Sequence, residues 1–257
     1  INARRDGRYV GPDARTLDEA GLVAHIVSLA NQRGRYLVQE CLSNNDAMRD
    51  LGDLTSLRVT SCKTEDGDFE ATNATLKLAL GGGGVDNFHQ GGAVAKVDMA
   101  SGVVGAASDS WAQRPCVWHD RHPLTNAPIA GRILPYWHET VRLVEKAHSL
   151  FPDRIMLGFD VAITDRGPVV IEGNVQSGCD MIQRTHDVPA GIGRLAECYA
   201  FHVSRAFERG LRRIDGKDAG PCGGERSSQL RILALPAPGE GLGIALEVVA
   251  PHVDLAA

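Results

Sequence analysis

No apolar run in this sequence is long enough to cross a bilayer, and the chain does not open on a charged leader followed by an apolar stretch. A membrane-spanning helix takes roughly 20 consecutive apolar residues, and a secretory leader combines a basic part with an apolar part. Cysteines are also few: 6 are spread over 257 residues, without a C-x-x-C pair. This spacing indicates neither a disulfide framework nor a zinc knuckle. We therefore expect a cytoplasmic protein with reduced thiols and no membrane partner.

The sequence also lacks a cluster of basic residues. Its formal net charge is −5, and its Lys and Arg side chains are spread along the chain. Proteins that bind nucleic acid usually gather such side chains into a patch or stripe, so nucleic acid is not an expected partner. The composition, 43% hydrophobic and 23% charged, is typical of a globular protein that buries one sizeable core or two small ones.

Periodic apolar residues predict helices and strands along most of the chain. Ile1 falls directly in a strand-like segment that ends at an Asp6-Gly7 turn signal, so we interpret the sequence as part of a longer chain. Thr16 to Glu19 has the spacing of a capping box before a helix that runs to Gln32. The other predicted helices are 137–147 and 192–211, the strands are 36–42, 54–62, 75–80, 93–97, 155–163 and 169–174, and 111–135 is a long loop.

Two apolar strands separated by an Asp-Arg-Gly turn predict a β-hairpin over residues 158–174. If the turn centres on Arg166, the strands pair so that Asp160 stands directly opposite Glu172. Side chains alternate across a strand, so Asp160, Glu172 and Asn174 share one face. The expected apolar pairs are Ile163 with Val169 and Val161 with Ile171, and these four residues share the core face with Phe159.

Three oxygen donors on one patch of a sheet predict a cation site. Directly opposite residues have Cβ atoms about 4.5–5.5 Å apart, so two carboxylates there repel unless one is protonated or a cation lies between them. Carboxylate and amide oxygens suit Mg²⁺ or Mn²⁺ shared with substrate phosphates. We interpret Asp160, Glu172 and Asn174 as metal ligands in a nucleotide site. The alternative is that the two carboxylates lie on a solvated face or pair with arginines.

Three further residues are weaker candidates for the same site. Arg58 projects from the polar face of the 54–62 strand, where a guanidinium could neutralise a triphosphate, although a surface ion pair is the alternative. Lys96 lies between Ala95 and Val97 and is either a second cation of the site or a strand-edge lysine. The run of glycines at 81–84 matches no phosphate-loop motif and favours a flexible hairpin loop, in which Asn87 is the residue expected to face the site.

The order of these segments resembles the ATP-grasp enzymes, particularly the sugar-transfer-associated subgroup. The resemblance covers roughly residues 1 to 212 and implies an α+β fold, an ATP-grasp-type antiparallel sheet with packed helices, incomplete at its N-terminus. Residues 213–257 match no pattern of the family and are expected to form a linker and a C-terminal extension, in which 230–235 and 244–249 are candidates for a hairpin. The segments that carry the resemblance are Tyr36–Leu42, Leu57–Thr60, Val85–Asn87 with Gly91-Gly92, Gly158–Asp160 and Ile171–Asn174.

The resemblance also implies roles for individual residues. Asp160, Glu172 and Asn174 match the positions that hold two Mg²⁺ ions on the ATP phosphates, and Arg58 and Asn87 resemble phosphate-facing residues of ligases that add glutamate. The family's glycine-rich flap and phosphate-binding lysines would lie before Ile1. The segment implied to bind adenine through its backbone comprises Gln39, Glu40, Cys41 and Leu42.

The function expected from this resemblance is an ATP-dependent ligase that joins a small-molecule carboxylate to an amine or another nucleophile through an acyl-phosphate. One alternative is a kinase or phosphotransferase that uses the same nucleotide site. Another is a catalytically silent module that binds a saccharide precursor or a protein partner. The sequence leaves the identity of the substrates and the oligomeric state open.

Overall fold

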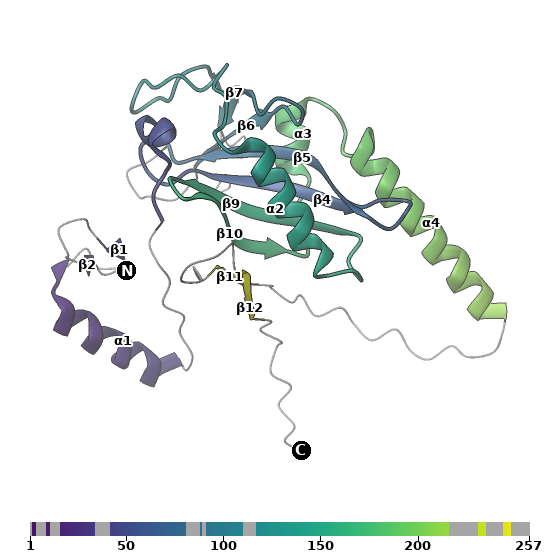
Figure 1. Cartoon of the computed structure of the whole chain (residues 1–257), viewed down its shortest axis with the longest axis horizontal. Coiled ribbons are helices and arrows are strands. Elements are labelled where there is room, and N and C mark those ends of the chain that lie inside the picture. Colours follow the sequence, from purple (N-terminus) through teal and green to yellow (C-terminus); the bar gives the residue numbers. More distant parts are fainter. Residues whose placement is uncertain are drawn as a thin grey trace. The chain divides into compact units, whose positions relative to one another are not determined.

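A computed structural model describes residues 2–3, 9–10, 16–33, 42–80, 88, 91–109, 117–215, 231–234 and 244–247 (Figure 1). The chain divides into two units, Ile1–Leu42 and Ser43–Ala257. Among the described helices, none combines the length and the apolar character that crossing a bilayer requires.

The first unit contains three short antiparallel strands and one helix. The strands pair in the order β1-β2-β3, and α1 follows β3. Asp18 caps α1, since its Oδ1 accepts a hydrogen bond from the backbone N of Gly21 at 2.8 Å. The predicted cap at Thr16 is wrong because Thr16 lies in β3. The bounds are β1 Asn2–Ala3, β2 Tyr9–Val10, β3 Thr16–Leu17 and α1 Glu19–Arg33.

The second unit is built on a seven-stranded sheet in the order β10-β9-β4-β5-β6-β7-β8. Every neighbouring pair of strands runs antiparallel. The predicted α+β fold, an antiparallel sheet with packed helices, is confirmed. The strands are β4 Ser56–Lys63, β5 Phe69–Leu78, β6 Ala93–Val97, β7 Val104–Asp109, β8 Trp118–His119, β9 Met156–Thr164 and β10 Gly167–Asn174; the helices are η1 Asp46–Leu51, α2 Trp137–Ser149, α3 Asp180–His186 and α4 Arg194–Asp215.

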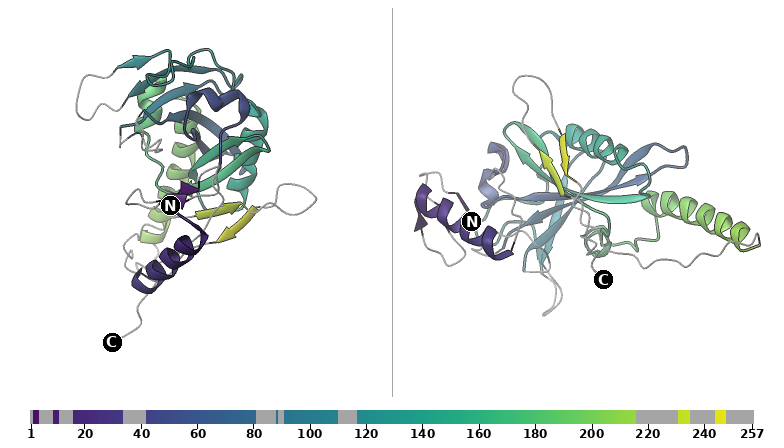
Figure 2. Two further views of the ribbon diagram at one scale, coloured as in Figure 1. Left: turned by 90° about the vertical axis from the view of Figure 1, so that its left-hand side faces the viewer. Right: turned by 90° about the horizontal axis from the view of Figure 1, so that it is seen from below.

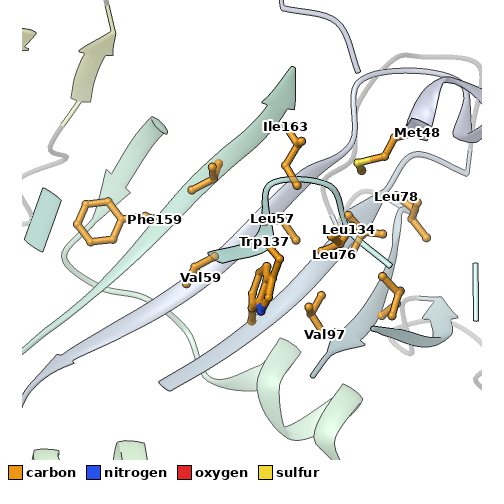
Figure 3. Packing of buried hydrophobic residues seen from close by; sticks show 14 of the residues in the cluster. Met48, Leu57, Val59, Leu76, Leu78, Val97, Leu134, Trp137, Phe159 and Ile163 are labelled. Carbon is orange, nitrogen blue, oxygen red and sulfur yellow. The ribbon is translucent and has the colours of Figure 1, made fainter. Parts of the chain in front are cut away.

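One face of the sheet is apolar and packs against α2. Alternate residues of β4, β5, β6 and β9 point to this side, and Trp137 and Val144 of α2 cover them. Figure 3 shows part of this core, which includes Leu57, Val59, Leu76, Val97, Phe159 and Ile163, all 0 to 1% exposed. Since this face is filled by side chains, polar chemistry on the sheet is confined to the other face.

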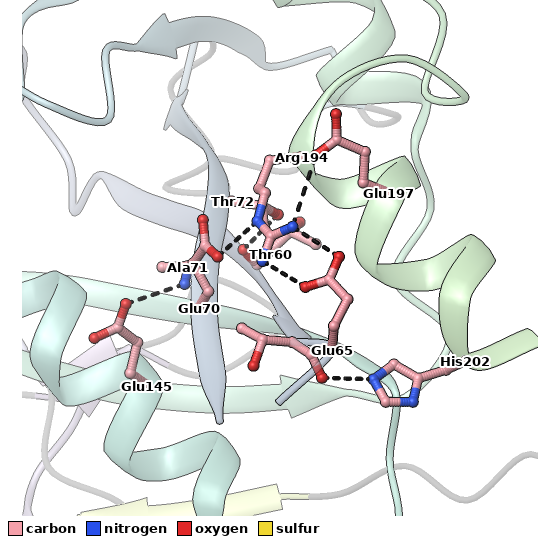
Figure 4. Close-up of polar contacts among 10 residues, drawn as sticks. Thr60, Glu65, Glu70, Ala71, Thr72, Glu145, Arg194, Glu197 and His202 are labelled. Carbon is pink, nitrogen blue, oxygen red and sulfur yellow. Dashed lines mark hydrogen bonds and ion pairs between the residues drawn. The ribbon is translucent and has the colours of Figure 1, made fainter. Parts of the chain in front are cut away.

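The other face is partly covered by α3 and α4 (Figure 2). Arg194, at the start of α4, forms ion pairs of 2.8 Å with Glu65 and with Glu70 of the β4–β5 hairpin (Figure 4). The imidazole of His202, two turns further along α4, lies 2.8 Å from the backbone oxygen of Thr64. These contacts hold α4 against one end of the sheet.

Two other predicted segments differ from the structure or lie outside it, whereas the pair of strands expected near the C-terminus is present. Most of the predicted strand 36–42 falls outside the described residues, and Leu42 itself is not in a strand. The long loop before α2 contains the edge strand β8. Two four-residue strands near the C-terminus, β11 Arg231–Ala234 and β12 Ile244–Glu247, pair with each other antiparallel.

Candidate active site

The hairpin of β9 and β10 brings Asp160 opposite Glu172, as predicted, but by a different register. The turn is two residues long, so Val161 pairs with Val170, and Ile163 pairs with Pro168. A β-bulge between Val170 and Glu172 then shifts the register by one residue and restores the Asp160–Glu172 pair. The predicted pairs Ile163–Val169 and Val161–Ile171 are therefore wrong. From β10, Val170 joins the core at 4% exposure, whereas Val169 and Ile171 are only half-buried.

The Asp160–Glu172 pair belongs to a row of directly opposite residues that crosses five strands. Glu172 of β10 pairs with Asp160 of β9, which pairs with Arg58 of β4. Arg58 pairs with Thr75 of β5, and Thr75 pairs with Lys96 of β6. Opposite residues of adjacent strands point to the same face, so the row lies on the side away from α2. We call these five residues the charged row.

Asp160 is buried at 7% exposure and is bound by two cations. The guanidinium of Arg58 donates from Nε to Oδ1 and from Nη2 to Oδ2, the latter at 3.2 Å. The ammonium of Lys77 donates to Oδ2 at 2.9 Å. Burial by itself raises the pKa of Asp160, but the hydrogen bond from Arg58 and the charge of Lys77 outweigh it, so the pKa lies below its ordinary value. The counter-charge of Asp160 is therefore supplied from within the chain.

Lys77 is a member of this site that the sequence analysis did not identify. It lies two residues after Thr75 in β5, on the same face of the sheet, and is only 8% exposed. A lysine is rarely buried without a charged partner. Its position between two leucines in a strand was the available signal, because those leucines face the core and direct Lys77 to the polar face.

Glu172 and Asn174 are in a different electrostatic situation from Asp160. Both are half-buried. Within the described part of the chain, the Glu172 carboxylate makes no hydrogen bond or ion pair. The Nδ2 atom of Asn174 is buried and has no hydrogen-bond partner. Polar atoms in this state usually meet water or a ligand.

The donor set fits a divalent cation in part. Glu172 offers an unpaired carboxylate, and a 180° turn of the Asn174 amide would place its oxygen at the buried unpartnered position. Such oxygens suit Mg²⁺ or Mn²⁺. Both Asp160 oxygens, in contrast, already accept hydrogen bonds from cations. Among the residues that the structure describes, no group of three or more His, Cys, Asp or Glu side chains gathers around one point.

A second row of polar residues runs beside the charged row. Asn174 pairs with Gly158, Gly158 with Thr60, and Thr60 with Asn73. The Thr60 hydroxyl and the Asn73 carbonyl are buried without a partner. Ser177, in the loop after β10, fills the space left by Gly158: a Cβ added at Gly158 would lie 2.1 Å from the Ser177 Oγ. The polar face thus has unmet hydrogen-bonding capacity next to the charged row.

The remaining predicted residues lie at the edge of this site or outside it. Lys96 is exposed and ends the charged row on β6. Gln39, Glu40, Cys41 and Asn87 lie outside the described residues. Leu42 is half-buried and belongs to the first unit.

Comparison with known proteins identifies one family. The family described as sugar-transfer associated ATP-grasp matches residues 2–188, a span that includes the charged row and Lys77. No curated protein matches the chain. Because the match covers well over half of the 257 residues, the chain belongs to the sugar-transfer associated ATP-grasp family, a membership that supports ATP binding and ATP-dependent, ligase-like chemistry.

Proposed function

We propose that this protein is an ATP-dependent ligase that joins a small-molecule carboxylate to an amine or another nucleophile. A carboxylate oxygen of the substrate attacks the γ-phosphorus of ATP, the bond to the β–γ bridging oxygen breaks, and ADP leaves. The nucleophile then attacks the acyl carbon of the resulting acyl-phosphate, inorganic phosphate leaves, and the nucleophile loses a proton. Family membership supports the use of ATP, and the choice of a carboxylate acceptor is our proposal.

The observation that carries this proposal is the charged row on the polar face of the sheet. Together with Lys77 of β5, it sets carboxylates on β9 and β10 beside cations on β4, β5 and β6. Phosphoryl transfer needs little covalent help from a protein and depends mainly on positioning and on charge stabilisation. A row with both signs of charge offers oxygen ligands for a divalent ion and cations for the phosphates.

Arg58 and Lys77 are the residues proposed to bind the transferring phosphoryl group. A guanidinium presents a planar fork of donors that matches phosphate oxygens, and an ammonium acts as a compact point charge. Glu172 and Asn174 are the residues proposed to hold a divalent cation, together with Asp160. When bound, such an ion would neutralise charge on the phosphate oxygens.

The test is ADP release by the purified protein in the presence of Mg²⁺, ATP and panels of candidate acids and amines. ADP that requires both an acid and a nucleophile, with a product of the summed mass less water, supports a ligase. A stable phosphorylated acceptor would instead identify a kinase. If no acceptor gives metal-dependent ADP and no nucleotide binds, the protein is a silent module and the proposal is wrong.

A further inference from the structure

Both oxygens of Asp160 are engaged by cations of the chain. Arg58 donates to both oxygens, and Lys77 donates to Oδ2 at 2.9 Å. The three side chains are well shielded from water, with exposures of 10% for Asp160 and Lys77 and 14% for Arg58. In this environment an ion pair is much stronger than at the surface, because the surrounding medium screens charge poorly.

This arrangement conflicts with metal binding at the same carboxylate. A divalent cation binds a carboxylate oxygen at about 2.0–2.6 Å, and it would place a double positive charge next to the Arg58 and Lys77 charges. Repulsion between like charges at such distances favours their separation. The Asp160 carboxylate has lone pairs enough for both, but this repulsion makes a divalent ion compete with Arg58 and Lys77 for it.

The neighbouring strand shows on which side a divalent ion would be received. Glu172 stands directly opposite Asp160, and among the described residues its carboxylate has no cationic partner. Arg58 lies on the other flank, on β4. An ion between Asp160 and Glu172 would draw Asp160 away from the cations on β4 and β5.

We infer that Arg58 and Lys77 form a binding pair for a phosphoryl anion, and that Asp160 occupies this pair until a divalent cation takes the carboxylate and releases it. The Asp160 carboxylate stands in for the phosphate in the metal-free protein. Metal and phosphoryl anion then assist each other's binding, and by linkage each raises the affinity for the other by the same factor. The inference rests on the proposed function only in that the anion is the phosphoryl part of a nucleotide.

The first experiment removes the occupant of the pair. Inorganic triphosphate is titrated calorimetrically into wild type, Asp160→Asn and Asp160→Asn/Lys77→Met, each with a metal chelator present. Asp160→Asn removes the carboxylate that competes with the anion for Arg58 and Lys77, so this variant should bind metal-free triphosphate about tenfold more tightly than wild type. Adding Lys77→Met should remove this gain. Asp50→Asn is the matched control, since it deletes the same charge from an ion pair of 2.7 Å with Arg132 that lies outside the row. An equal gain in the control, or no gain in Asp160→Asn, would overturn the inference.

A second variant covers the possibility that Asp160→Asn does not fold. Lys77→Gln keeps Asp160 and both of its bonds to Arg58 but removes the ammonium that donates to Oδ2. The affinity for Mn²⁺ alone, measured by electron paramagnetic resonance, should rise about fivefold. An unchanged or lower Mn²⁺ affinity would contradict the competition between Lys77 and the metal.

The outcomes separate this inference from the proposed function. If wild type binds Mg²⁺ and nucleotide together but neither variant changes the affinity for triphosphate or Mn²⁺, the proposed ATP site stands and the exchange at Asp160 is refuted. If the variants respond as expected but the protein releases no ADP with any acceptor, the exchange at Asp160 stands and the ligase function is refuted.

Discussion

Replacing Asp160 with Asn should strongly destabilise the protein. The substitution keeps the shape of the side chain but leaves Arg58 and Lys77 as two nearly buried charges without their shared carboxylate, since these side chains are only 14% and 10% exposed. Removing one partner of a buried ion pair costs about 3–5 kcal/mol, because the remaining charge is uncompensated. Arg58 loses the carboxylate that accepts both of its described side-chain hydrogen bonds, so we expect a loss of at least about 3 kcal/mol in the free energy of unfolding.

The magnitude can be checked by urea-induced unfolding of wild type and variants, followed by circular dichroism, with the slopes compared to confirm that the unfolded states are alike. Asp50→Asn again serves as the control, because Asp50 is 50% exposed and its ion pair with Arg132 is partly solvated. Its loss should stay below about 1 kcal/mol. If Asp160→Asn is no less stable than Asp50→Asn, the burial and pairing ascribed to Asp160 are wrong.

Three further predictions concern other parts of the second unit. Glu172→Gln should lower turnover on the order of 100-fold while leaving the unfolding free energy nearly unchanged, because no described partner of the carboxylate is lost; this is checked by steady-state ADP release and by urea unfolding. Gly158→Ala should cost about 1–3 kcal/mol in urea unfolding, since its Cβ would lie 2.1 Å from the Ser177 Oγ and 2.7 Å from the Ser177 Cβ, and adding Ser177→Gly should recover part of that loss. Burial lowers the pKa of His148 to about 4, so the stability that depends on neutral His148 should be fully present above about pH 6.5 and be lost as the pH drops towards 4. His148→Gln should flatten the pH dependence of the thermal denaturation midpoint in that window.

Each of these predictions has an outcome that contradicts its reasoning. Unchanged turnover in Glu172→Gln would remove this residue from the site. Equal losses in Gly158→Ala with and without Ser177→Gly would show that Ser177 is not the obstacle. A wild-type profile that is flat between pH 4 and 6.5 would mean that His148, which bonds the Ser61 hydroxyl at 2.8 Å, is not kept neutral by burial.

The sequence predicted the central pair of the site because strand periodicity assigns side chains to faces. Asp160 and Glu172 differ from their apolar neighbours, and their parity relative to the turn placed them on one face. A β-bulge leaves no trace in an alternating pattern of apolar and polar residues, so the pairs predicted between Glu172 and the turn are wrong. The pair was still correct because the shorter turn and the bulge shift the register by one residue in opposite directions.

The residues that neutralise Asp160 could not be deduced in the same way. Arg58 meets Asp160 because β4 pairs with β9. These strands are not joined by a turn: β9 begins 93 residues after β4 ends, and β5 to β8 and α2 lie between them in the chain. Lys77 reaches Asp160 from the next strand, β5. Such partners depend on the strand order of the whole sheet, which the periodicity of a single sequence does not encode.

Calorimetric titration of an unhydrolysable ATP analogue, with Mg²⁺ and then with a chelator, shows whether the charged row binds the phosphates of ATP together with a divalent cation. We expect binding that depends on Mg²⁺ in wild type and is weakened in Glu172→Gln. Binding of equal strength with and without Mg²⁺, or no binding under either condition, would contradict it.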